Sequence, residues 1–411
     1  MKKTRFLLFS VLLVLMGALL SACAGGRVVA AGAPAVTVEG DRAYLASGGS
    51  VYSLDLATGT EPTTTNAKGE IVPLRFPAQS KNMAFGSAPA AISEDQMVIG
   101  NAYSNDRKHL FYSFNPQTMA YGSQPWPFEG PDLWMGNPTV LEGVIYAPNS
   151  SGGMYAFDPD GTLLGQFETG GSLWAQPVTD GKDLYVASLD HHIYAVDPAD
   201  LSQPLWDTEL DASLVSAPAV SDGKLYVGSI NGSLYALDAS TGDVLWKVTL
   251  DGGIWGTPAL PAAAAEPQAG QPAGTAASAA ATPEPSPTPE APAAGKTLYI
   301  GTALESGAGT LYSINTGDGS TVWSVPSSGA IASSPIVHEN IVYFVTEDGM
   351  IRAVNADKTP AWQQPLGGKF YTAPMVAGDL LLVAPTNNND VFLAAYTLDG
   401  DQKWVFSPNK K

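Results

Sequence analysis

The sequence contains one cysteine in 411 residues, and it has 20 lysines and arginines against 39 aspartates and glutamates. A single cysteine has no partner within the chain, which excludes a fold held together by internal disulfides. The formal net charge of −19 predicts a surface that repels phosphate backbones and anionic lipid headgroups, so we do not expect nucleic-acid binding. Charged residues are scarce at 14%, whereas 43 glycines and 32 prolines are typical of many strands joined by tight turns.

The amino-terminal segment has a basic start followed by the apolar stretch 6–20, which is too short for a comfortable membrane span. Next comes the sequence Leu-Ser-Ala-Cys, which ends at Cys23 and resembles the lipobox of bacterial lipoproteins. We therefore expect residues 1–22 to be a lipoprotein signal peptide, Cys23 to carry the acyl groups, palmitate among them, and residues 23–33 to form a lipidated tether. The alternative is an ordinary secretion signal followed by an incidental cysteine.

A short pattern recurs eight times along the rest of the chain. Each copy has a proline followed by two apolar residues, an apolar strand of the type LYVGS, an alternating strand of the type LYALD and a segment centred on tryptophan. The opening prolines are Pro34, Pro89, Pro138, Pro177, Pro218, Pro258, Pro335 and Pro374. A unit of about 40 residues with four short strands is the signature of a β-propeller blade. We therefore predict an all-β fold over residues 34–411, an eight-bladed β-propeller of four-stranded antiparallel blades.

The tryptophans of the fourth strands keep a constant distance from the next copy. In five copies the tryptophan precedes the next opening proline by 12 residues, and a sixth tryptophan fills the same position in the last copy. These residues are Trp126, Trp206, Trp246, Trp323, Trp362 and Trp404. Insertions therefore fall in turns, which tolerate extra length. We expect each indole ring to have a structural role, docked between neighbouring blades.

The sixth copy is interrupted by residues 261–295. This segment consists almost wholly of alanine, proline, glycine, serine, threonine and glutamine, so we expect a disordered insert. The insert lies between the first and second strands of its blade, whereas the lipidated tether leads into a first strand. In an up-and-down blade these two positions lie on opposite faces of the disc. The insert is therefore expected to project away from the membrane.

One copy contains a complete AxDxxTGxxxW motif, formed by Ala236, Asp238, Thr241, Gly242 and Trp246. This motif resembles the tryptophan-docking motif of the PQQ-like β-propeller family, and the resemblance covers essentially all of residues 34–406. The family takes its name from enzymes that hold pyrroloquinoline quinone against a vicinal disulfide and a calcium ion. Because a chain with one cysteine cannot form that disulfide, the resemblance is closer to the lipid-anchored, non-catalytic propellers of the BamB kind. It implies no cofactor and no metal, with a PQQ- or quinone-dependent redox protein as the alternative.

Five aromatic residues lie three or four positions before an opening proline, on loops expected to approach the central axis on one face. They are Phe85, Trp134, Trp174, Trp255 and Tyr371. A ring of aromatic side chains at the mouth of a propeller is a candidate site for a protein partner or a ligand, such as a cell-wall carbohydrate. The alternative is that these side chains plug the channel.

Two further patterns have features of metal sites. His191 and His192 are adjacent, and neighbouring side chains on a strand point to opposite faces, so we do not expect them to share a metal ion. Residues 158–161 and 398–401 contain aspartates suited to a calcium loop, but both segments fall where hairpin turns are required. No catalytic triad, Cys–His pair or carboxylate pair stands out from the repeat, so we expect no enzymatic activity.

These patterns together predict a non-catalytic cell-envelope lipoprotein that acts as a scaffold. It would present loop surfaces to other envelope proteins, most simply those of a barrel-assembly complex, and would otherwise be a monomer. The residues after Cys23 lack the aspartate that resembles an inner-membrane retention signal. We therefore expect the outer membrane in a cell with two membranes, and the outer leaflet of the cell membrane otherwise.

Overall fold

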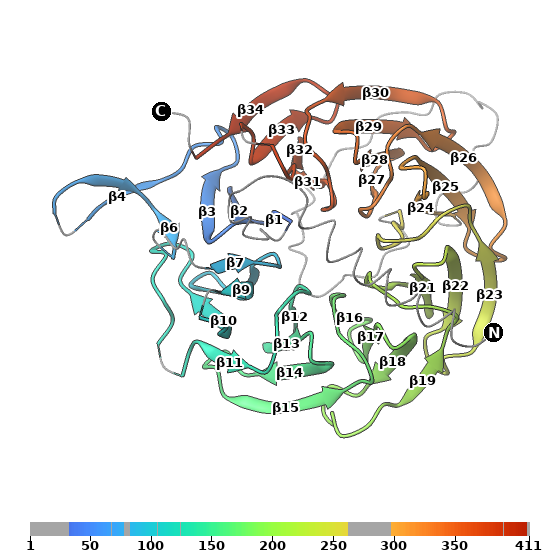
Figure 1. Cartoon of the computed structure of the whole chain (residues 1–411), viewed down its shortest axis with the longest axis horizontal. Coiled ribbons are helices and arrows are strands. Elements are labelled where there is room, and N and C mark those ends of the chain that lie inside the picture. Colours follow the sequence, from blue (N-terminus) through green and yellow to red (C-terminus); the bar gives the residue numbers. More distant parts are fainter. Residues whose placement is uncertain are drawn as a thin grey trace, which may run out of the picture.

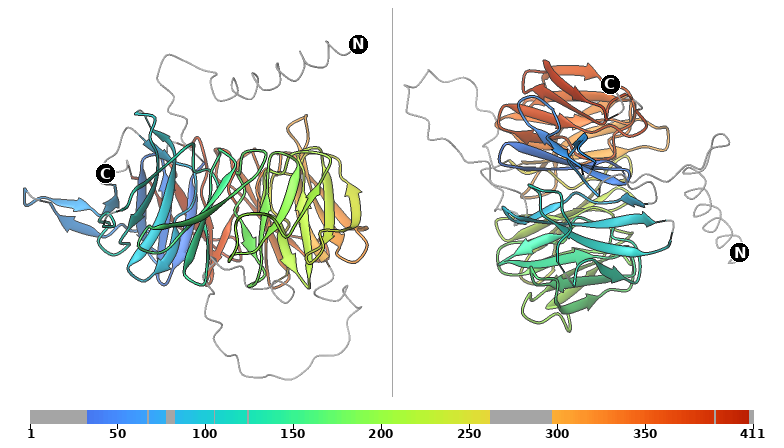
Figure 2. Two further views of the ribbon diagram at one scale, coloured as in Figure 1. Left: turned by 90° about the horizontal axis from the view of Figure 1, so that it is seen from below. Right: turned by 90° about the vertical axis from the view of Figure 1, so that its left-hand side faces the viewer.

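The computed structural model describes residues 33–408, apart from residues 67, 78–82, 105, 124, 262–296 and 389. The described part of the chain consists of strands, turns and loops, and it contains no helix that could cross a membrane. Small sheets are arranged radially around one axis and form a disc (Figure 1 and Figure 2). The prediction of an eight-bladed propeller is confirmed. The predicted signal peptide, Cys23, the tether up to residue 32 and nearly all of the insert lie outside the described residues.

Blades three, four and five each consist of four consecutive antiparallel strands. The first strand of each blade lies nearest the axis and the fourth lies at the rim (Figure 1). Blade three contains β12 (Thr139–Leu141), β13 (Val144–Pro148), β14 (Gly153–Phe157) and β15 (Leu163–Glu168). Blade four contains β16 (Val178–Thr179), β17 (Leu184–Ala187), β18 (His192–Val196) and β19 (Trp206–Glu209). Blade five contains β20 (Ala219–Ser221), β21 (Lys224–Gly228), β22 (Ser233–Asp238) and β23 (Val244–Thr249).

Blades seven and eight have the same arrangement. Blade seven contains β27 (Ile336–His338), β28 (Ile341–Val345), β29 (Met350–Asn355) and β30 (Pro360–Pro365). Blade eight contains β31 (Met375–Ala377), β32 (Leu380–Val383), β33 (Leu393–Thr397) and β34 (Gln402–Phe406).

The burial of each strand follows from its place in the blade. The second and third strands β21 and β22 are buried almost throughout, because both faces of the blade pack against a neighbouring blade. The outermost strand β23 alternates between exposed and half-buried residues, as expected where one face contacts protein and the other contacts water. The apolar core therefore lies between blades, in clusters that each join two neighbours.

The first blade departs from the prediction in its outer strand. The sequence suggests that residues 70–76 form this strand, but only β6 (Arg75–Phe76) pairs with β3 (Ser50–Asp55), inside β2 (Arg42–Ser47) and β1 (Ala35–Glu39). Residues 71–73 instead form β5 (Ile71–Pro73), which pairs with β4 (Thr63–Thr65) in a hairpin that projects from the rim of the disc (Figure 1). Strands β4 and β5 thus belong to a hairpin inserted before the outer strand of the blade.

The second blade is enlarged at its second strand. The nine-residue β9 (Gln96–Ser104) pairs with β8 (Ala90–Ser93) near its start and with β7 (Met83–Phe85) near its end. The blade is completed by β10 (His109–Phe114) and β11 (Phe128–Gly130). Trp126 lies just before β11 and not on it, although the sequence places it on the fourth strand.

The sixth blade has three named strands, β24 (Thr297–Ala303), β25 (Gly309–Asn315) and β26 (Thr321–Ser327). Its first strand is reduced to one bridge, in which Ala259 and Tyr299 exchange backbone hydrogen bonds of 2.8 Å. Pro261 stands two residues after Ala259, at the next position that would bond to β24, and it has no N–H to continue the ladder.

The ring closes between the last and first blades without exchanging strands, since each sheet is built from one stretch of chain. Leu45 and Leu54 of the first blade share an apolar cluster with Leu382 and Leu393 of the last. The indole N–H of Trp404 donates to the carbonyl of residue 56 at 2.8 Å, across 348 positions of the sequence. Packing and one docked tryptophan therefore hold the closure.

Candidate functional site

The loops that lead into the first strands carry two different registers of side chain. From Pro89 onward, the residue four positions before each opening proline is buried, and its neighbour three positions before is half-buried or exposed. The buried set is Phe85, Trp134, Leu173, Leu214, Ile254, Ile331 and Phe370. The outward set is Gly86, Met135, Trp174, Val215, Trp255, Ala332 and Tyr371. Neighbouring residues of an extended chain point to opposite sides, so the second set points away from the apolar clusters between blades.

This distinction corrects two of the predicted partner-binding residues. Phe85 and Trp134 are each 1% exposed and lie in apolar clusters between blades. The Trp134 indole donates to the carbonyl of His109 at 3.1 Å, so its polar group is satisfied internally. Sequence analysis merged the two registers because both contain aromatic residues close to a proline.

The other three predicted residues belong to the outward register. Trp174 is 41% exposed and Tyr371 is 40% exposed, whereas Trp255 is half-buried. Large aromatic side chains of this exposure are candidates for contact with another molecule. The structure therefore leaves Trp174, Trp255 and Tyr371 as the candidate surface, which we call the aromatic mouth.

The loops of the aromatic mouth are fixed by both flanking blades. The Ser172 hydroxyl donates to the carbonyl of Ser150 in blade three at 2.7 Å, and the Ser172 carbonyl accepts from the amide of Leu189 in blade four. In the loop before Tyr371, the amide of Gly367 donates to the carbonyl of Gly349 in blade seven, and Lys369 exchanges backbone hydrogen bonds with Thr386 in blade eight. Trp174 thus stands on a loop with a defined geometry.

Carboxylates surround the same loops. Asp190 accepts hydrogen bonds from the Tyr194 hydroxyl at 2.7 Å and from the Gly170 amide at 2.7 Å. Asp211 accepts from the Ser233 hydroxyl and from the Lys247 ammonium, both at 2.7 Å. Burial alone would raise the pKa of both carboxyls, but these donors outweigh it and hold each pKa below its ordinary value. Both groups are therefore charged at neutral pH.

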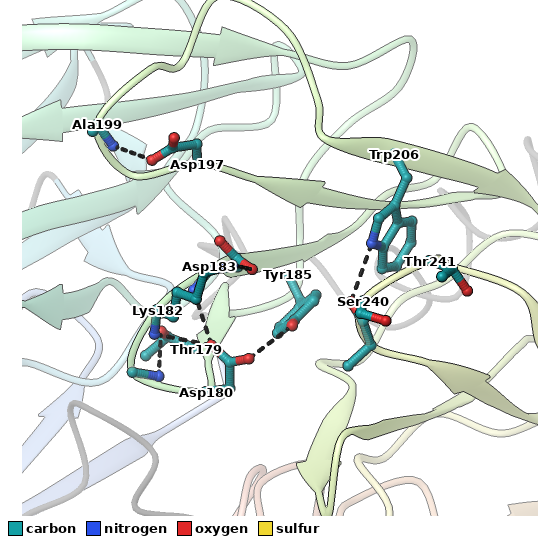
Figure 3. Close-up of polar contacts among 12 residues, drawn as sticks. Thr179, Asp180, Lys182, Asp183, Tyr185, Asp197, Ala199, Trp206, Ser240 and Thr241 are labelled. Carbon is teal, nitrogen blue, oxygen red and sulfur yellow. Dashed lines mark hydrogen bonds and ion pairs between the residues drawn. The ribbon is translucent and has the colours of Figure 1, made fainter.

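The six predicted docking tryptophans share one interaction. Each indole N–H donates to a backbone carbonyl one or two residues after the third strand of the next blade, and Figure 3 shows Trp206 lying on the turn with Ser240 and Thr241. The pairs are Trp126–Pro159 (3.3 Å), Trp206–Ala239 (3.1 Å), Trp246–Thr316 (3.1 Å), Trp323–Ala356 (2.8 Å), Trp362–Leu398 (2.7 Å) and Trp404–Leu56 (2.8 Å). Trp126 keeps this bond although it lies outside the strand.

Two of the eight junctions have no tryptophan at the docking position, because the residue 12 positions before Pro89 is Pro77 and the residue 12 positions before Pro177 is Gly165. The second of these, between blades three and four, is the open one. Ala195 and Ala236 pair with Trp206 and Trp246 across the third and fourth strands, and the corresponding Ala156 of blade three pairs with Gly165. A groove of about 520 Å³ lies at this place. The repeat contains the signal that identifies it, since the position 12 residues before Pro177 is Gly165.

The paired histidines occupy a turn and a strand start. His191 has a φ of 79°, and the His192 imidazole lies 3.1 Å from the carboxylate of Asp207 and stacks on Tyr194. Asp158 accepts from the amide of Thr162 at 2.8 Å, which is the hairpin role expected of it. In the described parts of the chain, no group of three or more acidic, histidine or cysteine side chains is placed to hold a metal ion.

Comparison with known proteins points to one family. A family model described as outer membrane protein assembly factor BamB matches residues 150–268 and 262–361, together just over half of the chain. The chain belongs to this family. No curated protein sequence matches the chain.

Solved structures have the same fold at low sequence identity. BamB from Moraxella catarrhalis is 14% identical, with a TM-score of 0.63, over 88% of this chain and 96% of that one. The computationally designed Ika8 protein is 12% identical, with a TM-score of 0.60, over 91% of this chain and 96% of that one. The predicted PQQ-like, BamB-like propeller architecture is therefore confirmed.

Proposed function

We propose that this protein is a non-catalytic, lipid-anchored scaffold of the cell envelope that binds other proteins through the aromatic mouth. The observation that carries the proposal is the exposure of Trp174 and Tyr371 on loops fixed by both flanking blades. Aromatic side chains that are rigid before binding give a large contact area at a small cost in conformational entropy. The name of the family, an outer membrane protein assembly factor, supports an assembly role in the envelope.

The charges around the mouth favour a partner with basic residues. Asp190, Asp211 and Asp348 have a pKa held below the ordinary value, so they stay ionised at neutral pH. The whole chain is strongly acidic, which steers cationic partners toward it and repels anionic ones. A partner segment with aromatic or apolar residues beside lysine or arginine would match this surface.

The lipid anchor at Cys23 would hold the aromatic mouth on the membrane side of the disc. Both β1 and the last strand place their free ends on the face of the loops that enter the first strands. A tether of residues 23–33 would span at most about 35–40 Å when extended. Mass spectrometry of the first tryptic peptide of the mature protein should find diacylglyceryl and acyl groups on Cys23.

Photo-crosslinking in intact cells tests the scaffold directly. A benzophenone amino acid replaces Trp174 in one strain, and in the control strain it replaces Leu245, which is 46% exposed on the outer strand β23. We expect a defined envelope protein to be captured at position 174 and not at position 245. Recovery of monomer alone, or the same products at both positions, would overturn the proposal.

A further inference from the structure

The groove between blades three and four lies where six other junctions have a docked tryptophan. Its walls are Tyr146, Ala156 and Gly165 of blade three and the turn 198–202 of blade four. At about 520 Å³ it is within the usual range of ligand pockets. Figure 3 shows the equivalent junction one blade further on, where Trp206 occupies this position.

Strand register aligns three positions of the two junctions. Across blade four, Trp206 pairs with Ala195, and Ala195 pairs with Tyr185, whose ring centroid lies 6.1 Å from that of Trp206. Across blade three, Gly165 pairs with Ala156, and Ala156 pairs with Tyr146. The small central residue and the tyrosine that accommodate an indole are therefore both present, without the indole. Leu201 stands where Gly242 lies beneath Trp206, so a ring in the groove would lie against the Leu201 side chain and not on a glycine.

The hydrogen-bond acceptor for the indole is present as well. In the six docked junctions it is a carbonyl one or two residues after the third strand, and Pro198 of blade four corresponds to the acceptor Pro159 of blade three, two residues after the strand. The Tyr146 hydroxyl donates to the Pro198 carbonyl at 3.4 Å. In blade five, Tyr226 makes the same contact with Thr316 at 3.5 Å while Trp246 donates to that carbonyl at 3.1 Å. One carbonyl can thus accept hydrogen bonds from a tyrosine hydroxyl and an indole N–H at the same time, and Pro198 could do the same.

The surroundings of the groove are apolar and acidic. Leu164 lines the groove and is 56% exposed. An exposed leucine does not stabilise the fold, but it offers apolar surface to a partner. Asp200 also lines it, and the charges of Glu142 and Asp197 act on Tyr146. Lys182 is nearby but pairs with Asp183 at 2.9 Å. The neighbourhood therefore complements an apolar group that carries a positive charge beside it.

We infer that this groove is a receptor for an aromatic side chain, best an indole, presented next to a basic residue by a partner polypeptide. The indole N–H would donate to the Pro198 carbonyl, and the ring would pack against Tyr146 and Leu201. The turn 198–202 joins a third strand to a fourth, on the face opposite the aromatic mouth. The groove is thus a second contact site, which rests on the proposed function only in that its occupant is a polypeptide.

Fluorine NMR with short peptides tests the inference on the mature chain. The probe is a pentapeptide amide, Gly-Lys-fluorotryptophan-Lys-Gly, whose fluorine signal is separate from the nine tryptophans of the protein. We expect concentration-dependent broadening of this signal with the wild type, and weaker broadening for the same peptide with glutamate in place of lysine. The variant Gly165→Trp should weaken binding by about tenfold or more, because its own indole fills the groove.

Two further variants keep the test decisive. In Gly165→Ala the added Cβ meets only Leu201 Cδ1, at 3.5 Å, so binding should persist. Ala199→Arg, on the exposed rim, should block the basic peptide even if Gly165→Trp folds poorly. No broadening with the wild type, or equal broadening with wild type, Gly165→Trp and Ala199→Arg, would overturn the inference. Crosslinking at position 174 would be unaffected by that result, so the two proposals fail separately.

Discussion

The junctions on the two sides of blade four solve the same packing problem in different ways. On one side, Trp206 donates its N–H to blade five and lies over Gly242, whose missing Cβ would come within 2.5 Å of the ring. On the other side, Gly165 leaves the corresponding space between blades three and four open. The ring nevertheless closes, with Phe167 and Leu173 sharing a buried cluster with Leu184 across the open junction. The buried inner strands are therefore enough to hold neighbouring blades together, and the docked tryptophan adds packing at the outer edge of the junction.

Replacing the docked indole should have the largest effect. Trp206→Ala removes a large packed ring and a hydrogen bond, so we expect the free energy of unfolding to fall by about 3–5 kcal/mol. The control Trp174→Ala, at an exposed position, should change it by about 0.5 kcal/mol or less. Urea denaturation followed by circular dichroism measures both. A loss below about 1 kcal/mol in Trp206→Ala would mean that the indole is not needed to seal the junction.

The glycine beneath the indole gives a smaller, matched test. Gly242 has a φ of +77° and touches Trp206, whereas Gly223 has a φ of +68° with nothing within 4 Å of an added Cβ. Alanine at either position strains the backbone, but only Gly242→Ala also displaces a ring. We expect Gly242→Ala to cost about 1–3 kcal/mol more than Gly223→Ala in the same denaturation experiment. Equal costs would show that backbone conformation alone selects glycine in this turn.

The pH dependence of stability should be smaller still. The pKa of Asp211 is lower in the folded chain than in an unfolded one, so the unfolded state takes up the proton first as the pH falls. Stability should therefore decline as the pH falls through about 4, the ordinary pKa of aspartate, and continue to decline below it. Thermal melts at several pH values should show a shallower decline for Asp211→Asn. An identical slope would mean that this carboxylate does not contribute.

Sequence patterns predicted the propeller, its eight blades and the six docking tryptophans because repetition places equivalent residues in equivalent surroundings. They were wrong where the repeat is broken locally. Residues 71–73 were predicted as part of an outer strand but form one strand of an inserted hairpin, and Phe85 differs from Trp174 by one step of register. A single step inverts the side-chain direction, and spacing counted as three or four residues cannot resolve it.

The groove was missed for a different reason. The repeat was defined by the tryptophans that are present, whereas the informative position is Gly165, which replaces one. The strand register, which pairs Ala156 with Gly165 and with Tyr146, shows that the alanine and the tyrosine are retained, whereas Leu201 replaces the glycine beneath the ring. A gap in a repeat is visible in the sequence, but whether neighbouring side chains fill it depends on packing in three dimensions.

The most direct test of the account is to move the open position by one blade. A chain with both Gly165→Trp and Trp206→Gly should close the first groove and open an equivalent one between blades four and five. Fluorine NMR with the basic fluorotryptophan peptide should then show binding that is blocked by a bulky substitution at Ser240, and no longer by Ala199→Arg. Binding that still depends on position 199, or that disappears while the chain remains folded, would contradict the claim that these junctions are indole receptors.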